Sequence, residues 1–171
     1  MKEILFILSL FITQLVFAQS AEITKDASGN KIIKGFITKN ELASDTVFAW
    51  FTQNQKGYTP EKAALQAFTS AKDSIHILAF AGTWCGDTKN LLPKFFALTD
   101  AAGFSQDHIT LLGVDRSKKT INHLAEAFKI INVPTFIVLK NGQEVGRVVE
   151  YGKYGMFDKE LGEIISSSNK K

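Results

Sequence analysis

The segment SIHILAFA, residues 74–81, places the strongest restriction on how this chain can fold. It is a near-continuous apolar run, and strands with this pattern are typically buried on both faces of a sheet. A strand of this kind needs a covering layer above it and another below it. The sequence therefore predicts a central sheet with helices on both faces, which is an α/β architecture.

The segments after residue 81 fit this architecture. We expect a helix, a strand, a short amphipathic helix, two strands and a final helix, over 85–101, 108–115, 120–130, 134–140, 143–150 and 155–168. The last two strands meet at Asn141-Gly142, which is a strong hairpin signal. The order β-α-β-α-β-β-α combines a parallel βαβ unit with an antiparallel hairpin, and so predicts a mixed central sheet flanked by helices.

An extension of strands and helices is predicted before this core. Residues 21–38 read as two short strands around a turn at 28–30. A helix is expected to follow over 38–58, where Thr38 and Glu41 fit a capping box.

A second helix of the extension is expected to open at Thr59-Pro60, because proline suits the first helical position. Trp50 and Tyr58 are interpreted as aromatic side chains that pack between these helices and the sheet. The extension is therefore expected to pack on the core.

The first residues have the anatomy of a signal peptide. Lys2 gives a positive start, an apolar run covers 4–17, and Val16 and Ala18 fit the pattern before a cleavage site. We expect cleavage after Ala18, so that the mature protein begins at Gln19 and is periplasmic or secreted; an uncleaved anchor is the alternative. The expected division of the chain is a signal peptide, an extension and a core, over 1–18, 19–73 and 74–171.

Composition excludes several classes of function. The net charge of +3 is too small to indicate nucleic-acid binding, and no run of lysine or arginine supports it. The three histidines, His76, His108 and His123, lack the spacing of metal ligands, so we expect no metal and no cofactor. No membrane contact is expected after signal cleavage, and the sequence implies no oligomeric state. A single cysteine means that the chain has no internal disulfide.

That cysteine, Cys85, lies in the segment FAGTWCGDTKN, between the predicted central strand and the following helix. At the first turn of a helix, free backbone N–H groups and the helix dipole favour a thiolate, which is the nucleophile in disulfide exchange. Trp84 supplies a flat apolar surface beside the sulfur, and the Thr88 hydroxyl can donate a hydrogen bond to it. Asp87 opposes the thiolate if its carboxylate approaches. The alternative is that Cys85 is a small buried apolar side chain.

At these residues the sequence resembles the thioredoxin superfamily. The turn TWCGDT is similar to the family's Trp-Cys-Gly-Pro-Cys turn, and Pro93 falls where the family has a helix-kinking proline. The segment NVPTFIVLKNG resembles the segment around the family's cis-proline, which places Pro134 in that role and Val133 before it. The resemblance covers about residues 74–167. It implies a thioredoxin fold and a binding surface for substrates formed by Trp84, Gly86, Asp87, Val133 and Pro134. The whole chain is similar to secreted bacterial thioredoxin-like proteins with Trp-Cys-x-Asp-Ser/Thr turns.

Two departures from the family pattern bear on chemistry. Thr88 replaces the second cysteine, so the usual intramolecular resolution of a mixed disulfide is impossible. Ala79 stands where the family has a buried aspartate associated with proton transfer at that second cysteine. Both changes fit a site adapted to one thiol.

Three functions stay open at this point. The first is thiol-disulfide exchange with protein or small-molecule thiols and disulfides, with Cys85 and Thr88 as the candidate catalytic residues. The second is a non-catalytic module that binds peptides or clients, in which the backbone of Val133 pairs with an extended peptide. The third is a regulatory thiol that forms a disulfide-linked dimer. The segment VDRSKK, residues 114–119, is interpreted as a solvated loop.

Overall fold

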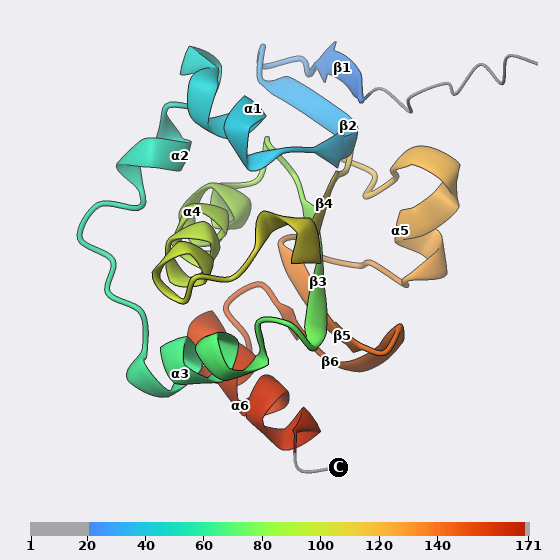
Figure 1. Ribbon diagram of the computed structural model, residues 1–171. Coiled ribbons are helices and arrows are strands. Elements are labelled where there is room, and N and C mark those ends of the chain that lie inside the picture. Colours follow the sequence, from blue (N-terminus) through green and yellow to red (C-terminus); the bar gives the residue numbers. More distant parts are fainter. Residues whose placement is uncertain (1–20, 170–171) are drawn as a thin grey trace, which may run out of the picture.

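The predicted central strand is β3 (Ile75–Ala81), which lies inside a six-stranded sheet of order β1-β2-β4-β3-β5-β6 (Figure 1). The computed structural model describes residues 21–169. The expected signal peptide and its cleavage site lie outside the described residues. The other strands are β1 (Glu22–Lys25), β2 (Lys31–Ile37), β4 (Ile109–Gly113), β5 (Thr135–Lys140) and β6 (Gln143–Val149).

The strand pairing is mixed, as the sequence predicts. β3 runs parallel to β4 and antiparallel to β5, and β5 and β6 form the expected antiparallel hairpin. Its turn residues have positive φ, 52° at Asn141 and 75° at Gly142, as a two-residue turn that continues the strand twist requires. The mixed, helix-flanked sheet that the resemblance implied is confirmed.

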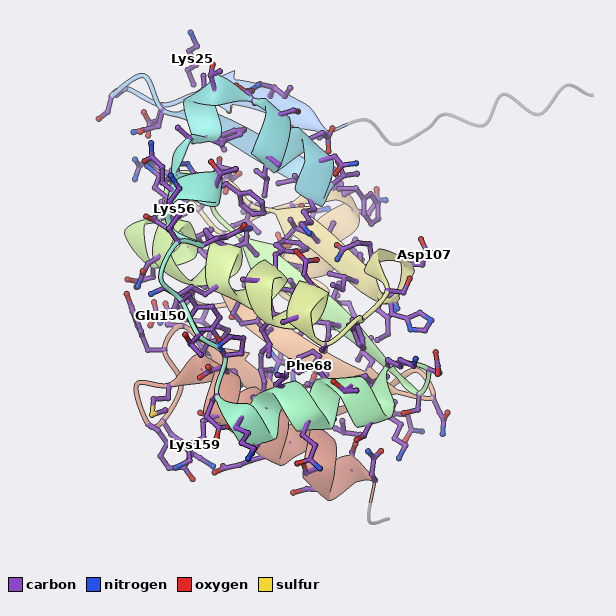
Figure 2. The ribbon with its side chains drawn as sticks, turned by 60° about the vertical axis from the view of Figure 1, so that its left-hand side comes forward. Lys25, Lys56, Phe68, Asp107, Glu150 and Lys159 are labelled. Atoms are coloured by element: carbon purple, nitrogen blue, oxygen red, sulfur yellow. The ribbon has the colours of Figure 1, made fainter. Side chains whose placement is uncertain are left out.

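Helices cover the two faces of the sheet unequally. One face, called here the broad face, lies under α3 (Lys62–Ala71), α4 (Gly86–Ala101) and α6 (Phe157–Ser168), and Figure 2 labels Phe68 of α3 on this side. The opposite or narrow face lies under α5 (Leu124–Ala127), which stands alone on its side of the sheet in Figure 1. The predicted two-sided burial of β3 is therefore correct.

Alternation along the strands sorts the core into two clusters. In β3, Ile77 and Ala79 belong to the broad-face cluster, whereas Leu78 and Phe80 belong to the narrow-face cluster. The broad-face cluster is rich in phenylalanine, including Phe48, Phe51, Phe68, Phe95, Phe96, Phe104, Phe136 and Phe157. The buried members of the narrow-face cluster are Leu78, Phe80, Leu112, Val114, Ala125, Ile130, Val133 and Ile137.

The extension adds β1 and β2 to the edge of the sheet, where β2 pairs antiparallel with β4. The predicted capping box is present: Thr38 accepts from the Glu41 N–H at 3.2 Å, and Glu41 accepts from the Thr38 N–H at 2.6 Å. The predicted single helix over 38–58 is wrong, because Asp45 is extended and caps a new turn. The segment forms α1 (Lys39–Ser44), the 3₁₀ helix η1 (Thr46–Phe48) and α2 (Trp50–Gln53).

The second helix of the extension, α3, begins at Lys62 and not at the predicted Pro60. Glu61 is its N-cap residue, and its carboxylate accepts from the Ala64 N–H at 2.7 Å. A carboxylate cap therefore sets the start of the helix.

A buried carboxylate joins the extension to α6. Asp158 accepts hydrogen bonds from the Tyr58 hydroxyl at 2.7 Å and from the Glu61 N–H at 3.0 Å. Burial and the neighbouring Asp158 raise the pKa of Tyr58. Trp50 and Tyr58 pack against the broad-face cluster, as predicted. The boundary between extension and core at residues 73 and 74 stays a prediction.

The amphipathic helix predicted over 120–130 is much shorter in the structure. It consists of the 3₁₀ helix η3 (Ile121–His123) and the single turn of α5, because Asn122 and His123 have positive φ of 50° and 55°. The 3₁₀ helix η2 (Gln106–His108) precedes β4. Among residues 21–169, no helix is long and apolar enough to cross a membrane.

Candidate functional site

Cys85 lies where the chain turns from the buried end of β3 into α4. Its backbone N–H donates to the Gly82 carbonyl at 2.8 Å, and its carbonyl accepts from the Lys89 N–H at 3.0 Å. Cys85 has φ −82° and ψ 132°, so it is the N-cap residue of α4, and its side chain is half-buried. The strand and the helix thus fix the backbone that carries the sulfur.

The sulfur contacts the segment before β5. The Cys85 thiol donates to the Val133 carbonyl, with 3.2 Å between Sγ and oxygen. The Val133–Pro134 peptide bond is cis, and the Pro134 carbonyl accepts from the Glu150 N–H at 2.7 Å. Within residues 21–169 the sulfur makes no capping hydrogen bond to α4, and its hydrogen bond is directed to Val133 and not to the helix end.

Thr88 occupies the place of a second cysteine, one turn into α4. Its side chain is fully buried, and its hydroxyl oxygen accepts from the Gly82 N–H at 3.2 Å. Within residues 21–169 its hydroxyl makes no hydrogen bond to Cys85, so the donation to sulfur proposed from the sequence is not seen. Thr88 instead stabilises the turn before Cys85 through this hydrogen bond with Gly82. Gly86 is exposed and Asp87 is half-buried on the same first turn.

Trp84 is held by backbone groups that follow β3 and β4. Its indole N–H donates to the Val114 carbonyl at 3.0 Å, after the end of β4. A Cβ atom at Gly82 would lie 2.8 Å from the indole, so the ring packs directly on this glycine. Trp84 and Cys85 both pack against the narrow-face cluster, which also contains Val133.

The structure therefore brings together most of the residues predicted from the sequence. Cys85, Trp84 and Val133 meet at the narrow face, Pro134 adjoins Val133, and Thr88 supports the turn from the helix side. Sequence reasoning missed Arg116, whose guanidinium carbon lies 5.0 Å from the centre of the Trp84 ring. Its only signal was its place three residues after the end of β4, in a segment interpreted as a solvated loop.

Ala79 is fully buried in the broad-face cluster. Its side chain points away from the narrow face, because alternation places it opposite Leu78 and Phe80. The position that bears a carboxylate in the family pattern is therefore an ordinary part of an apolar core here.

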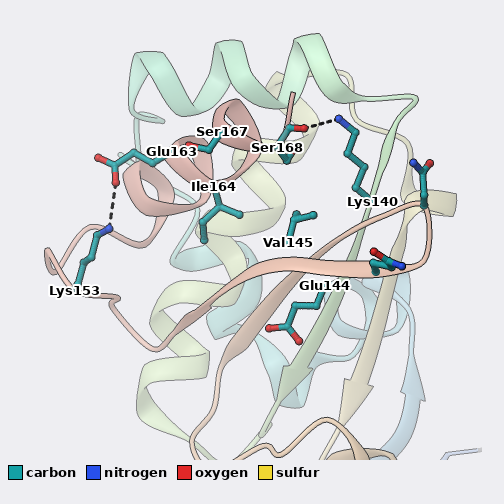
Figure 3. Close-up of a pocket in the computed structure, with 10 residues that line it drawn as sticks. Lys140, Glu144, Val145, Lys153, Glu163, Ile164, Ser167 and Ser168 are labelled. Atoms are coloured by element: carbon teal, nitrogen blue, oxygen red, sulfur yellow. Dashed lines mark hydrogen bonds and ion pairs between the residues drawn. The ribbon is translucent and has the colours of Figure 1, made fainter. Parts of the chain in front are cut away.

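A separate pocket of about 700 Å³ lies between β6 and α6 (Figure 3). It is at the opposite end of β5 from Pro134, since Thr135 pairs with Phe80 and Lys140 pairs with Ile75. Its charged groups already have partners. Lys140 donates to the Ser168 carbonyl at 2.7 Å, and Lys153 lies 3.5 Å from Glu163. The pocket has no cysteine or histidine in its lining, so size alone does not make it the reactive site.

Two of the histidines, His76 and His108, make polar contacts within the fold. A ring nitrogen of His76 lies 2.8 Å from the Thr110 hydroxyl, and burial, with a smaller contribution from His108, lowers the pKa of His76. The His108 ring lies 2.7 Å from the Lys72 carbonyl. In the part of the chain that the structure describes, no group of three or more His, Cys, Asp or Glu side chains could hold a metal ion.

Comparison with known proteins assigns the family. The thioredoxin family model matches residues 58–161, and the chain therefore belongs to the thioredoxin family. Thioredoxin from Echinococcus granulosus is 32% identical over 84 residues, which cover 49% of this chain and 73% of that protein. Thioredoxin H2-2 from Oryza sativa is 31% identical over 104 residues, covering 60% of this chain and 72% of that protein. Family and relatives support a thiol redox function with thiol or disulfide partners.

A solved structure supports the fold alone. An HIV epitope scaffold aligns with a TM-score of 0.54 at 14% identity, over 80% of this chain and 94% of the scaffold. The alignment extends beyond the residues matched by the family model. It therefore agrees with a fold that includes part of the extension.

Proposed function

We propose that this protein is an extracytoplasmic monothiol member of the thioredoxin family, which exchanges disulfides through Cys85. The observation that carries the proposal is the position of Cys85. It is the N-cap residue of α4, and its sulfur faces the Val133 carbonyl beside Pro134. In the resemblance described above, that pairing of cysteine and proline marks the nucleophile and the surface that receives the substrate.

The proposed step conserves electrons and atoms. The Cys85 thiol gives its proton to solvent, and the sulfur attacks one sulfur of a client disulfide. The client S–S bond breaks, a Cys85–client disulfide forms, and the released client thiolate takes up a proton. An external thiol then attacks the mixed disulfide, forms a new disulfide with the client and returns Cys85 as a thiol. Thr88 cannot perform this second attack, because it has no sulfur.

The location outside the cytoplasm rests on residues 1–18 of the sequence. Their charge, apolar run and small residues before the cleavage site are those of a signal peptide. An intact-mass measurement on protein from the cell envelope or medium tests this, and we expect an N-terminus at Gln19. Residues 1–18 retained in that fraction would contradict it.

A client-binding module without turnover is the second candidate. Thr88 and Ala79 favour it, because one removes the resolving thiol and the other removes the carboxylate that accompanies that thiol in the family pattern. Its expected partners are extended peptides or unfolded clients that dock beside Val133 and Pro134. A regulatory dimer linked through Cys85 is the third candidate, and the capture experiment below distinguishes it from the other two.

The experiment is capture of disulfide-linked partners from envelope extracts. The wild type is expected to accumulate mixed disulfides that a reductant releases, and Cys85→Ser is expected to form none. Thr88→Cys supplies a resolving thiol at the matching position, so it is expected to release clients and to accumulate fewer complexes than the wild type.

Three outcomes separate the candidates. Partners that bind wild type and Cys85→Ser equally would support the client-binding module and overturn exchange. A product with the mass of two chains and no other partner would support the regulatory dimer. Mixed disulfides that depend on Cys85 and diminish in Thr88→Cys support the proposed exchange.

A further inference from the structure

We propose that Arg116, held in place by Asp26 of the N-terminal hairpin, is a positioning residue for Trp84 and thereby controls how bulky disulfides approach Cys85. This inference rests on the proposed exchange function, because it names what positions the surface beside the reactive thiol. It assigns a role in the site to the β1–β2 hairpin, which lies outside the segment that resembles the thioredoxin superfamily.

The first observation is the contact with the ring. The Arg116 guanidinium carbon lies 5.0 Å from the centre of the Trp84 ring, within the range in which a cation is attracted to an aromatic face. The indole N–H is fixed by the Val114 carbonyl, and the ring packs on Gly82. Arg116 therefore adds a contact from the loop after β4 to a ring that is otherwise held by the core.

The second observation is what holds the arginine. Arg116 donates from Nε at 2.9 Å and from Nη2 at 2.5 Å, both to the Oδ2 atom of Asp26. Two bonds to one oxygen fix the direction of the planar guanidinium group better than a single contact would. The pair joins positions 90 residues apart in the chain.

The third observation is that Asp26 is itself immobilised. Its Oδ1 atom accepts from the Ser28 N–H and the Asn30 N–H, each at 2.9 Å, and the Asn30 side chain donates to both carboxylate oxygens. The Asp26 side chain is only 7% exposed. The Arg116 guanidinium, with these N–H donors, holds the pKa of Asp26 well below its usual range. The hairpin thus offers a fixed, charged acceptor for Arg116.

Together these contacts form a continuous path from the hairpin to the residue next to the thiol. Asp26 orients Arg116, Arg116 lies over Trp84, and Trp84 precedes Cys85. Because Asp26 holds Arg116, the guanidinium stays beside the ring as a fixed planar group. Releasing it frees the indole to move, and this changes the approach of a large substrate more than that of a small reagent.

The test uses two variants that release Trp84 in different ways. Arg116→Met keeps an unbranched side chain and removes the guanidinium, whereas Asp26→Asn keeps an oxygen acceptor for the turn and removes the charge that holds Arg116. The control is Glu22→Gln, which removes an ion pair between the two strands of this hairpin, Lys34 with Glu22 at 3.0 Å.

The experiment measures the rate at which Cys85 reacts with each of two reagents, a bulky peptide disulfide and the small alkylating agent iodoacetamide. We expect Arg116→Met and Asp26→Asn to slow the reaction with the peptide disulfide by about two- to fivefold, the size of one exposed cation–π contact. The rate with iodoacetamide should change less than the rate with the disulfide. Glu22→Gln should match the wild type with both reagents.

A second readout follows the ring directly. With Trp50→Phe, Trp84 is the only tryptophan, and acrylamide quenching of its fluorescence should increase in Arg116→Met and Asp26→Asn but not in Glu22→Gln. If Trp50→Phe fails to fold, the two rates in the wild-type background still decide the question.

The inference would be overturned if the ratio of the two reaction rates, peptide disulfide to iodoacetamide, were the same in the wild type and in both variants. An effect of Glu22→Gln as large as that of Asp26→Asn would also overturn it, since this would indicate general loosening of the hairpin. If no variant and no wild-type protein forms a mixed disulfide, the proposed function fails, while the quenching experiment still tests whether Arg116 positions Trp84.

Discussion

The two faces of the sheet differ in size and in what they carry. The broad face is covered by α3, α4 and α6 over a cluster rich in stacked and edge-on phenylalanines, including Phe136, whose ring centre lies 4.7 Å from that of Phe95. The narrow face is covered by the single turn of α5 and has far fewer buried side chains. Cys85, Trp84 and Val133 all belong to or contact the narrow side.

The two faces therefore contribute differently to stability and to the reactivity of the site. Burial of apolar area is the main favourable term in folding, so the broad face supplies most of the stability. The narrow face has few other side chains between the sheet and the site, so its packing directly determines where the site residues lie. A change of the same size should therefore affect unfolding alone on one face, and both unfolding and reactivity on the other.

The largest expected effect uses two adjacent residues of β5 that point to opposite faces. Phe136→Ala should lower the free energy of unfolding by about 3–5 kcal/mol and Ile137→Ala by about 2–5 kcal/mol, because both side chains are fully buried. Per folded molecule, the rate of mixed-disulfide formation should fall in Ile137→Ala and stay near the wild type in Phe136→Ala. Denaturant unfolding and thiol trapping measure the two quantities. Equal rates in the two variants would remove the distinction between the faces.

A smaller effect is expected where the extension meets the broad face. Asp158→Ala leaves the Tyr58 hydroxyl and the Glu61 N–H without their acceptor. We expect a loss of about 1–3 kcal/mol in unfolding free energy, the cost of an unpaired buried group. Tyr58→Phe is the milder control, because it removes one donor and leaves Asp158 with the other. A change in Cys85 reactivity in Asp158→Ala would show that the two faces are coupled.

Thr88→Val tests the support of the narrow-face site from within α4. Valine keeps the shape but leaves the Gly82 N–H unpaired, which should cost about 1 kcal/mol in unfolding free energy. The turn that carries Trp84 and Cys85 should loosen, and exchange with a peptide disulfide should slow. Thr88→Ser retains the hydroxyl and should restore most of the rate. Failure of serine to restore it would show that the methyl group, and not the hydrogen bond, supports the turn.

The smallest effect concerns pH. His76 lies on the narrow side of β3, and its pKa is lowered in the folded protein by burial and by His108. A base with a lowered pKa stabilises the fold above its unfolded pKa of about 6.5, and this contribution is lost as the pH falls from there through the folded pKa. Between pH 7 and pH 5, the free energy of unfolding should therefore decrease less steeply in His76→Gln than in the wild type. An unchanged slope would contradict this assignment.

The sequence predicted the core elements because their signals are local. The apolar run of β3, the hairpin residues Asn141 and Gly142 and the capping box at Thr38 each depend on neighbours in the chain. The break at Asp45 was missed because its side chain offers the backbone a competing cap within a helical pattern. The short α5 was missed because the left-handed backbone at His123 interrupts an amphipathic pattern.

The candidate site also combines residues that the sequence could predict with contacts that it could not. Cys85 at the start of a helix could be predicted from its own segment, and the resemblance to a family supplied Val133 and Pro134 as its neighbours. No local pattern could show that Asp26 meets Arg116, because the pairing depends on β2 lying beside β4. The same holds for the acceptor of the Cys85 thiol, since Val133 approaches only when β5 pairs with β3.

The pairing of β2 with β4 also has a consequence for the order of assembly. Gly35 lies opposite Gly113, so this pair of strands closes a loop that contains both α4 and β3, whereas β5 and β6 meet across two residues. Closing a longer loop costs more chain entropy, and contacts of high sequence separation slow folding. We expect the β5–β6 hairpin to gain protection in pulsed hydrogen exchange before β2 does. During that interval Trp84 would lack the arginine that Asp26 holds, so a newly made chain should react with bulky disulfides more slowly than the fully folded protein.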